Sequence, residues 1–373
     1  MKTRKRLGLL TSGGDCPGLN AVIRAAVRHA TLTYGWEVVG IPYATQGLLD
    51  HKSIALNVYG IDLRGFDPML SMGGTILGSI NKGDTEAKAD EVIAGYWDLG
   101  LDALIAIGGD GSLAILHQLA QKGSWHFVGV PKTIDNDVAL TERSVGFDTA
   151  VSTIVDALSR LSYTAASHDR VMVVEVMGRD AGHLALHAGI AGGADVILIP
   201  EIPYSIENVC NKITELRDRW GRRFAIVVVA EGAKTTQGES RYYTDALGEM
   251  RLRGIGEYIA DQISYCSGKT IEARVTVLGH VQRGGEPSAF DRLLATVFGK
   301  TAVDLVAQEQ YGQMVAWQNG RVVNLPIDDV VAHSPVLVNP NDYLVQTARA
   351  LGTYIGDFYQ FQDIPKPEIL ALH

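Results

Sequence analysis

The sequence predicts an α/β protein built from two doubly wound domains with mainly parallel sheets and an active site in the cleft between them. Three observations lead to this prediction. Apolar strand-like runs alternate with longer helix-compatible segments, glycine or polar turns follow the runs in both halves, and the length of 373 residues suits two domains. Ligands of such sheets bind beyond the carboxyl ends of the strands, so functional residues are expected in those turns.

Seven apolar runs predict strands, and each run ends near glycine, proline or a polar residue. They are residues 7–10, 38–41, 104–107, 127–130, 171–176, 196–199 and 224–230. Helical spacing of apolar residues predicts five helices. These are residues 21–31, 113–122, 150–162, 206–220 and 255–266. Most helices therefore follow a strand directly, as they do in a parallel sheet.

Composition excludes several classes of function. The net charge is −9, so a general nucleic-acid or anionic-membrane surface is not expected, and an anionic substrate needs local arginine and lysine clusters. No apolar run is long enough to span a membrane, and the apolar start is too short for a signal peptide. The three cysteines, Cys16, Cys210 and Cys266, are far apart and odd in number, which fits a reducing cytoplasm.

Two turns close together in the sequence contain the highest density of residues suited to anion binding and catalysis. The run at 104–107 ends in Gly-Gly-Asp-Gly-Ser at 108–112, where glycines let backbone NH groups approach an anion and Asp110 offers a hard oxygen ligand. The run at 127–130 ends in Pro-Lys-Thr-Ile-Asp-Asn-Asp at 131–137, which combines Lys132 with Asp135 and Asp137. Either turn alone is equally well explained as a βα loop with a helix cap, whereas the two together indicate catalysis.

The first strand leads into a third turn of the same kind. Thr-Ser-Gly-Gly-Asp-Cys-Pro-Gly at 11–18 joins a strand to a helix start, which suits phosphate binding by backbone NH groups. It is not a P-loop, because no Gly-Lys-Ser or Gly-Lys-Thr follows. Further motifs stand at 176–182 (Val-Met-Gly-Arg-Asp-Ala-Gly), 230–232 (Ala-Glu-Gly) and 278–285 (Leu-Gly-His-Val-Gln-Arg-Gly-Gly). Taken in order, these six motifs strongly resemble the phosphofructokinase family from about residue 7 to residue 292.

The resemblance implies a 6-phosphofructokinase that transfers the γ-phosphoryl group of ATP to the 1-hydroxyl of fructose 6-phosphate, giving fructose 1,6-bisphosphate in glycolysis. By similarity, nucleotide phosphates are held by Gly14, Gly108, Gly109, Asp110, Gly111 and Ser112. Asp110 serves Mg²⁺, Asp135 takes the proton of the sugar hydroxyl, and Asp137 supports Asp135 or holds the hydroxyl. Lys132 and Arg179 join Asp135 as catalytic residues.

The resemblance also implies a sugar-phosphate site and an oligomer. The residues matched to this site are Thr133, Asp135, Asp137, Met177, Gly178, Arg179, Glu231, His280 and Arg283. Arg170 and Arg274 match positions that reach the 6-phosphate from a neighbouring subunit, which implies a homotetramer with shared active sites. The implied donor domain comprises residues 1–146 with 282–332, and the sugar-phosphate domain comprises 147–281 with 333–373. The implied location is the cytoplasm.

Two positions bear on the phosphoryl donor. Lys132 matches the lysine that pyrophosphate-using members have at this position, whereas the common bacterial ATP-using form has glycine there. Gly111 favours ATP, because the aspartate of pyrophosphate users would crowd a nucleotide α-phosphate. We therefore expect ATP, with pyrophosphate as the alternative donor. Asn81 replaces an arginine that bridges the two substrates' phosphates in the common form, and Lys132 can supply the missing charge.

An effector site is only partly matched. Arg24, Arg28, Gly193 and Asp195 match part of the bacterial nucleotide effector site, but Ser162 and Phe224 replace basic residues there. Arg24 and Arg28 stand one helical turn apart, which fits either a phosphate site or an exposed helix face. The alternative function outside the enzymes is a catalytically inactive metabolite sensor or regulatory subunit. Retention of both Asp110 and Asp135 argues against that alternative.

Overall fold

The chain divides into two compact units. Unit 1 comprises Met1–Ala150 and Arg283–Val336, and unit 2 comprises Val151–Gln282 and Leu337–His373. The structure is a computed structural model that describes residues 4–58, 67–79, 85, 87–237, 242–244, 250–252, 254–268 and 270–356. Each unit is built around its own sheet, and each is described separately.

Unit 1 contains a seven-stranded sheet in the order β13-β12-β5-β4-β1-β2-β3. Its strands are β1 (Arg6–Thr11), β2 (Glu37–Gly40), β3 (Ile54–Ala55), β4 (Ala103–Gly108), β5 (Phe127–Pro131), β12 (Gln313–Gln318) and β13 (Arg321–Pro326). The five inner strands run parallel, and β3 and β13 pair antiparallel at the two edges. Strands β4 and β5 are buried throughout, which explains their unbroken apolar runs.

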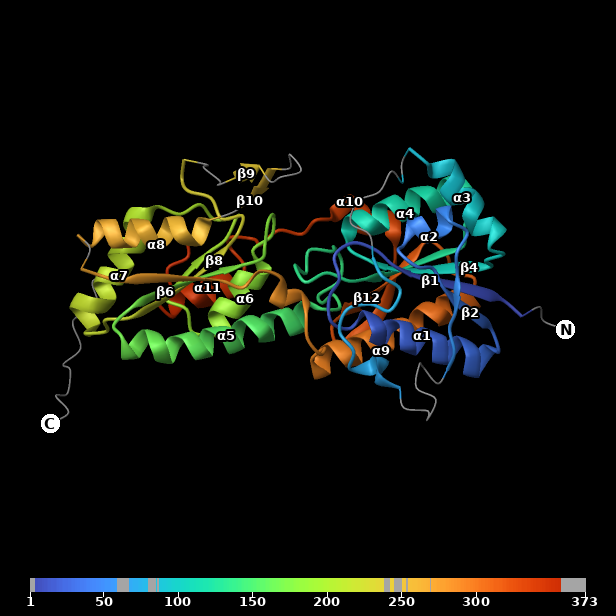
Figure 1. The fold of residues 1–373 in the computed structure, drawn as a ribbon, viewed down its shortest axis with the longest axis horizontal. Coiled ribbons are helices and arrows are strands. Elements are labelled where there is room, and N and C mark those ends of the chain that lie inside the picture. Colours follow the sequence, from blue (N-terminus) through green and yellow to red (C-terminus); the bar gives the residue numbers. More distant parts are fainter. Residues whose placement is uncertain are drawn as a thin grey trace. The chain divides into compact units, whose positions relative to one another are not determined.

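Helices cover both faces of this sheet. They are α1 (Leu19–Tyr34), α2 (Thr45–Leu49), η1 (Pro68–Leu70), α3 (Ala89–Asp98), α4 (Asp110–Gly123), α9 (Ala289–Ala307) and α10 (Ile327–His333). In Figure 1, α1 and α9 lie on one side of the sheet and α2, α3 and α4 on the other. The core on the second side includes Leu48, Tyr96, Leu116 and Val330. Unit 1 is thus doubly wound, as the sequence predicted.

Unit 2 contains a four-stranded parallel sheet in the order β11-β6-β8-β7. Its strands are β6 (Val171–Val176), β7 (Val196–Leu198), β8 (Ala225–Ala230) and β11 (Ala273–Val277). A separate antiparallel pair is formed by β9 (Tyr242–Thr244) and β10 (Met250–Leu252). The other elements of unit 2 are α6 (His183–Ala191), α7 (Ile206–Trp220), α8 (Ile255–Cys266) and α11 (Tyr343–Ala350), together with η2 (Gly279–Arg283), whose last residue belongs to unit 1. Helix α5 (Phe147–Ser167) begins in unit 1 and continues into unit 2.

The helices of unit 2 also lie on two faces. Figure 1 shows α8 on one side of the sheet and α5 on the other, and α7 shares the core on the side of α8. The core beneath α7 and α8 contains Val173, Val227, Ile213 and Ile259. The predicted α/β class with mainly parallel sheets is therefore confirmed in both units.

All seven predicted strands and all five predicted helices exist, but several elements were not predicted. Helix α6 is apolar on nearly every side, so its sequence has no helical periodicity. Strand β11 alternates exposed and partly buried residues at a sheet edge, so it has no continuous apolar run. The β12–β13 hairpin had a readable signal, because Asn319 and Gly320 both take positive φ between the strands. Asn-Gly is a strong hairpin dipeptide.

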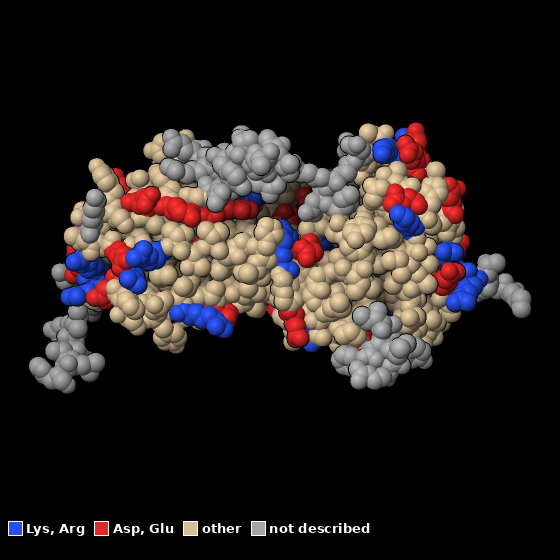
Figure 2. All heavy atoms as spheres, viewed as in Figure 1, with Lys and Arg blue, Asp and Glu red and all other residues tan. Residues whose placement is uncertain are grey.

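Charged side chains are interspersed with uncharged ones on the face drawn in Figure 2, and an acidic row lies over the part of unit 2 that α8 occupies. Among the described residues, no helix has both the length and the apolar character that a membrane span requires.

The cysteines differ from the sequence expectation. Cys210 of α7 and Cys266 of α8 form a disulfide, although 56 residues separate them. Their pairing removes the support that cysteine usage gave to a reducing cytoplasm. Cys16 is a buried free cysteine whose thiol donates to the carbonyl oxygen of Val145. Burial raises the pKa of the Cys16 thiol to about 12.

We predict that Cys16 resists alkylation in the folded protein. With a pKa of about 12, its thiolate fraction at pH 8 is about 10³-fold below that of an ordinary cysteine, and the thiolate is the nucleophile. Iodoacetamide treatment followed by peptide mapping should leave Cys16 unmodified in the native protein and modify it after unfolding. Rapid native modification would show that this thiol is neither buried nor protonated.

Candidate active site

Three turns of unit 1 meet at one edge of its sheet. Strands β1, β4 and β5 are parallel neighbours, so their carboxyl ends lie side by side. The turns that follow them enclose a cavity of about 370 Å³. Its lining residues are Gly13, Gly14, Gly109, Asp110, Gly111, Ser112, Ile115, Lys132, Thr133, Asp135, Asp137 and Arg283. The structure thus brings together nearly all the predicted donor residues, and Gly108 is the last residue of β4 beside them.

The N-terminus of α4 opens into this cavity. The helix begins at Asp110 after Gly109, and no side chain caps its first turn. Uncapped NH groups and the helix dipole together favour an anion at this end. A Cβ atom built on Gly111 would meet no atom within 4 Å, so this residue leaves open space at the helix start. A Cβ on Gly108 would meet the Ser112 side chain at 2.9 Å, so glycine is needed there.

Lys132 supplies a buried positive charge. Its side chain is only 3% exposed, and its ammonium group donates to the carbonyl oxygen of Gly14. Its backbone NH donates to the Gly108 carbonyl oxygen at 2.9 Å, which ties β5 to the end of β4. Burial lowers the pKa of Lys132 below its usual value, and the nearby Arg283 lowers it further. A lysine held in this way can place its charge against a phosphate without first ordering a long side chain.

Asp135 and Asp137 both face the cavity from the turn after β5. Between them, Asn136 has a φ of 53° and fixes the turn through both ends of its amide. Its Nδ2 donates to the Glu142 carbonyl oxygen at 3.1 Å, and its Oδ1 accepts from the Ser144 NH at 2.8 Å. The NH of Asp135 also donates to Thr133 Oγ1 at 3.0 Å. The two carboxylates are therefore positioned by a rigid turn.

Arg283 lines this cavity as well, although its sequence motif predicted only a contact with the sugar phosphate. Its Nη1 donates to the carbonyl oxygen of Asp15 at 3.3 Å. A Cβ atom on Gly14 would lie 2.6 Å from the same Nη1, so the glycine lets the guanidinium approach the turn. Sequence spacing alone did not reveal this contact, because 268 residues separate Arg283 from Asp15.

A second group of predicted residues gathers in unit 2. Met177, Gly178 and Arg179 follow β6, Glu231 follows β8, and His280 follows β11. These three strands are parallel neighbours, so their loops share one edge. Arg179 and His280 are exposed there. The unit 2 sheet therefore presents a cation, an imidazole and a carboxylate in neighbouring loops.

Backbone contacts hold these loops against each other. The NH of Gly232 donates to the Gly178 carbonyl oxygen at 3.1 Å, and the NH of Glu231 donates to that of Val176 at 2.9 Å. A Cβ atom on Gly232 would lie 1.8 Å from the Arg179 carbonyl oxygen. The loop after β8 thus contacts the loop after β6 directly through a residue without a side chain.

Arg170 and Arg274 are not part of this group. Arg170 immediately precedes β6, and Arg274 pairs in register with Met172 near the start of that strand. Seven residues separate Arg170 from Met177, which is about 20 Å of extended chain. Both arginines instead contact Glu272, through Arg170 Nε at 2.6 Å and through Arg274 Nη2. Hydrogen bonding from Arg170 is the main cause that lowers the pKa of the Glu272 carboxyl.

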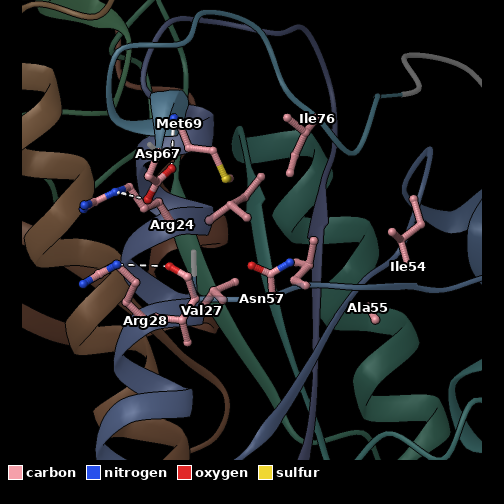
Figure 3. A pocket seen from close by; sticks show the side chains of 12 residues that line it. Arg24, Val27, Arg28, Ile54, Ala55, Asn57, Asp67, Met69 and Ile76 are labelled. Carbon is pink, nitrogen blue, oxygen red and sulfur yellow. Dashed lines mark hydrogen bonds and ion pairs between the residues drawn. The ribbon is translucent and has the colours of Figure 1, made fainter. Parts of the chain in front are cut away.

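The partial effector residues lie in two different cavities. In unit 1, Arg24 and Arg28 border a largely apolar cavity of about 210 Å³, shown in Figure 3. Arg24 Nε pairs with Asp67 at 2.6 Å, and Arg28 Nη1 donates to the Val58 carbonyl oxygen at 3.0 Å. Both arginines therefore already have partners within the chain.

In unit 2, Gly193 and Asp195 border a separate cavity of about 560 Å³. Arg222 binds both carboxylate oxygens of Asp195, at 2.7 and 2.9 Å. Burial nevertheless raises the pKa of Asp195. Arg222 was not predicted from the sequence, and the ring centre of Phe224 lies 4.2 Å from its guanidinium. Asn81 lies outside the described residues, so its prediction stays untested.

The comparisons with known proteins agree on one family. The model of the family described as phosphofructokinase matches residues 6–306. The chain is 69% identical over 354 residues to ATP-dependent 6-phosphofructokinase 2 of Nostoc sp., covering 95% of this chain and 99% of that protein. It is 65% identical over 355 residues to ATP-dependent 6-phosphofructokinase of Thermosynechococcus vestitus, covering 95% and 94%.

Among solved structures, the phosphofructokinase of Saccharomyces cerevisiae aligns with a TM-score of 0.73 and 31% identity. The alignment covers 88% of this chain and 45% of the yeast chain, so this chain spans less than half of the yeast chain's length. The region matched by the family model contains all three turns of the unit 1 cavity and all three loops of the unit 2 group. The chain therefore belongs to the phosphofructokinase family, as its six motifs had indicated.

Proposed function

We propose that the chain is an ATP-dependent 6-phosphofructokinase, which transfers the γ-phosphoryl group of ATP to the 1-hydroxyl of fructose 6-phosphate. The observation that carries this proposal is the unit 1 cavity, where a helix N-terminus, the buried Lys132 and Asp135 meet. Phosphoryl transfer depends on positioning and charge stabilisation, and these groups supply both. Relatives at 65% and 69% identity are named for this activity.

Unit 1 carries the phosphoryl donor in this proposal. The turn at Gly14 and the start of α4, from Gly108 to Ser112, receive the nucleotide phosphates through backbone NH groups. Within the described residues, no group of three or more His, Cys, Asp and Glu side chains is arranged to hold a metal ion. A single carboxylate at Asp110 fits Mg²⁺ nonetheless, because this ion is commonly held by one or two carboxylates together with phosphates and water. Bound there, Mg²⁺ would neutralise charge on the phosphates.

Asp135 is the proposed base, which accepts the proton of the 1-hydroxyl as the phosphoryl group is transferred. Asp137, two residues further along the same rigid turn, either holds that hydroxyl or raises the proton affinity of Asp135. Lys132 faces the same cavity and stabilises negative charge on the transferred group. Arg179, from unit 2, is the proposed second cation.

Unit 2 carries the sugar phosphate. Met177, Gly178, Arg179, Glu231 and His280 are the proposed contacts from its loops. Thr133 and Arg283 complete the set from unit 1. Phosphoryl transfer requires the donor residues of unit 1 and the sugar-phosphate residues of unit 2 to bind two substrates that react with each other. A measurement of this activity therefore tests both assignments together.

Arg170 and Arg274 serve the site of a neighbouring subunit in this proposal. Their support is geometric: both lie near the opposite end of β6 from Met177, so one chain cannot direct all these groups at one small sugar phosphate. Activity then requires an assembled oligomer, and we propose a homotetramer. The proposed location is the cytoplasm, which now rests on the glycolytic substrates and not on the cysteines.

Pyrophosphate remains the second candidate donor. The specific observation in its favour is Lys132, which is buried and lines the donor cavity, and lysine is the residue type that pyrophosphate-using members have at this position. Gly111 favours ATP, because it leaves the helix start open where aspartate would crowd the α-phosphate.

The base assignment predicts the effect of Asp135→Ser. Turnover at saturating substrates should fall by about 10²-fold or more, while the KM values change far less, because general base catalysis typically contributes about 10² to 10⁴. Steady-state kinetics with ATP and fructose 6-phosphate measure this. Asp156→Ser is the matched control, since Asp156 is an exposed carboxylate on α5 that pairs with Arg160. Near-normal turnover of Asp135→Ser would show that Asp135 is not the general base.

The donor assignment predicts that Gly111→Asp sharply reduces the use of ATP. The Cβ atom of the new side chain meets no atom of the protein within 4 Å, and aspartate is favourable in the first turn of a helix, so the fold should persist. Its carboxylate instead repels and crowds the nucleotide phosphates. Phosphorylation is measured side by side with ATP and with pyrophosphate, which should be less affected. The assignment of ATP as donor would be wrong if the wild type used pyrophosphate but not ATP, or if the variant kept the ATP kinetics of the wild type.

The shared-site assignment predicts complementation between two inactive variants. Arg274→Ala and Asp135→Ser, mixed under conditions of demonstrated subunit exchange, should regain part of the wild-type activity. Some sites would then combine an intact Asp135 from one chain with an intact Arg274 from another. The absence of any recovery would show that both residues serve the site of the same chain.

A further inference from the structure

Gln282 is the one residue of the Gly-His-Val-Gln-Arg motif that is fully buried, with 0% of its side chain exposed. It carries no charge and does not reach the solvent side of the loops. A buried amide must satisfy its donor and its acceptor within the protein, because leaving either without a partner is costly. Its contacts therefore show what the residue does.

Both ends of the Gln282 amide bind backbone atoms of the proposed sugar-phosphate loops. Its Oε1 accepts from the NH of Met177 at 3.2 Å, in the loop after β6. Its Nε2 donates to the carbonyl oxygen of Gly279 at 2.9 Å, at the start of η2 after β11. One side chain thus links the loop that contains Met177, Gly178 and Arg179 to the loop that contains His280.

The Gln282 hydrogen bonds lie directly beyond the last backbone pairing of β6 with β11. Strands β6 and β11 pair in parallel up to Glu175 and Val277, and the NH of Leu278 still donates to the Glu175 carbonyl oxygen at 3.0 Å. Beyond that point β11 turns into η2, so its backbone no longer offers a partner to Met177. An amide has the same donor and acceptor as a peptide unit. Gln282 therefore supplies from a side chain the pairing that a longer β11 would have supplied from its backbone.

Backbone hydrogen bonds hold the opposite side of the same loop. Glu231 and Gly232 donate to the carbonyl oxygens of Val176 and Gly178. The Met177 loop is consequently fixed toward β8 by peptide groups and toward β11 by the Gln282 amide. Loss of the amide would free one side of the loop and leave the other in place.

We infer that Gln282 is a positioning residue for sugar-phosphate binding, which sets the spacing between the Met177–Arg179 loop and His280 through its two backbone hydrogen bonds. This inference rests on the proposed function, because it takes these loops as the sugar-phosphate site. Small displacements matter in such a site, since a shift of about 1 Å can cost as much as 10²-fold in rate.

The test replaces Gln282 by methionine, which keeps the length of the side chain and removes the amide. We expect KM for fructose 6-phosphate to rise about tenfold or more, with KM for ATP unchanged within about twofold and a smaller fall in turnover at saturating sugar phosphate. Asn20→Leu is the matched control. Asn20 is also 0% exposed, and its amide likewise binds backbone, namely the carbonyl oxygens of Met72 and Gly73 and the NH of Ile76. It should leave KM for fructose 6-phosphate unchanged.

Hydrogen exchange gives a readout that does not depend on activity. The NH of Met177 should exchange faster in Gln282→Met than in the wild type, whereas the amides of Glu231 and Gly232 should keep their protection. Gln282→Leu also removes both the acceptor for Met177 and the donor to Gly279, so it serves if the methionine variant does not fold. Unchanged exchange at Met177 would overturn the inference even if the enzyme phosphorylates a different sugar. Faster exchange together with an unchanged KM would show that the link is structural only.

Discussion

The parallel pairing of β1, β4 and β5 is the constraint on which the unit 1 site depends. Because the three strands point the same way, their carboxyl ends meet, and residues more than a hundred positions apart in sequence face one cavity. Burial of these strands fixes their register through apolar packing, so the turns inherit a defined spacing. The polar residues of the turns are the candidates for catalysis, and the apolar residues before them determine where those candidates lie.

Sequence patterns predicted the fold class and many of the elements with a distinct periodicity, although the amphipathic helices α3 and α11 were not predicted. The buried strands, such as β4 and β6, are continuous apolar runs, and amphipathic helices such as α7 show their spacing directly. Helix α6 and strand β11 did not stand out, because one is apolar on most sides and the other is a half-exposed edge. The site was predictable as a set of turns, since motifs of glycine and aspartate identify them locally.

What the sequence could not provide are contacts between residues distant in the chain. The Cys210–Cys266 disulfide, the bond between Arg283 and the Asp15 carbonyl, and the pairing of Arg222 with Asp195 all depend on tertiary packing. The role of Gln282 is of the same kind, since nothing in its motif shows that its amide turns inward. Local pattern identified candidate residues, whereas the packing of neighbouring strands decided which of them meet.

Gly232 illustrates a different kind of importance in a motif. Its backbone lies so close to the Arg179 carbonyl oxygen that a single added carbon would sit 1.8 Å away. No side chain fits there without forcing the two loops apart. The position therefore tolerates no residue other than glycine, although glycine carries no reactive group. The Ala-Glu-Gly motif therefore combines two separate demands: Glu231 is the proposed sugar-phosphate contact, and Gly232 allows its loop to lie directly against the loop after β6.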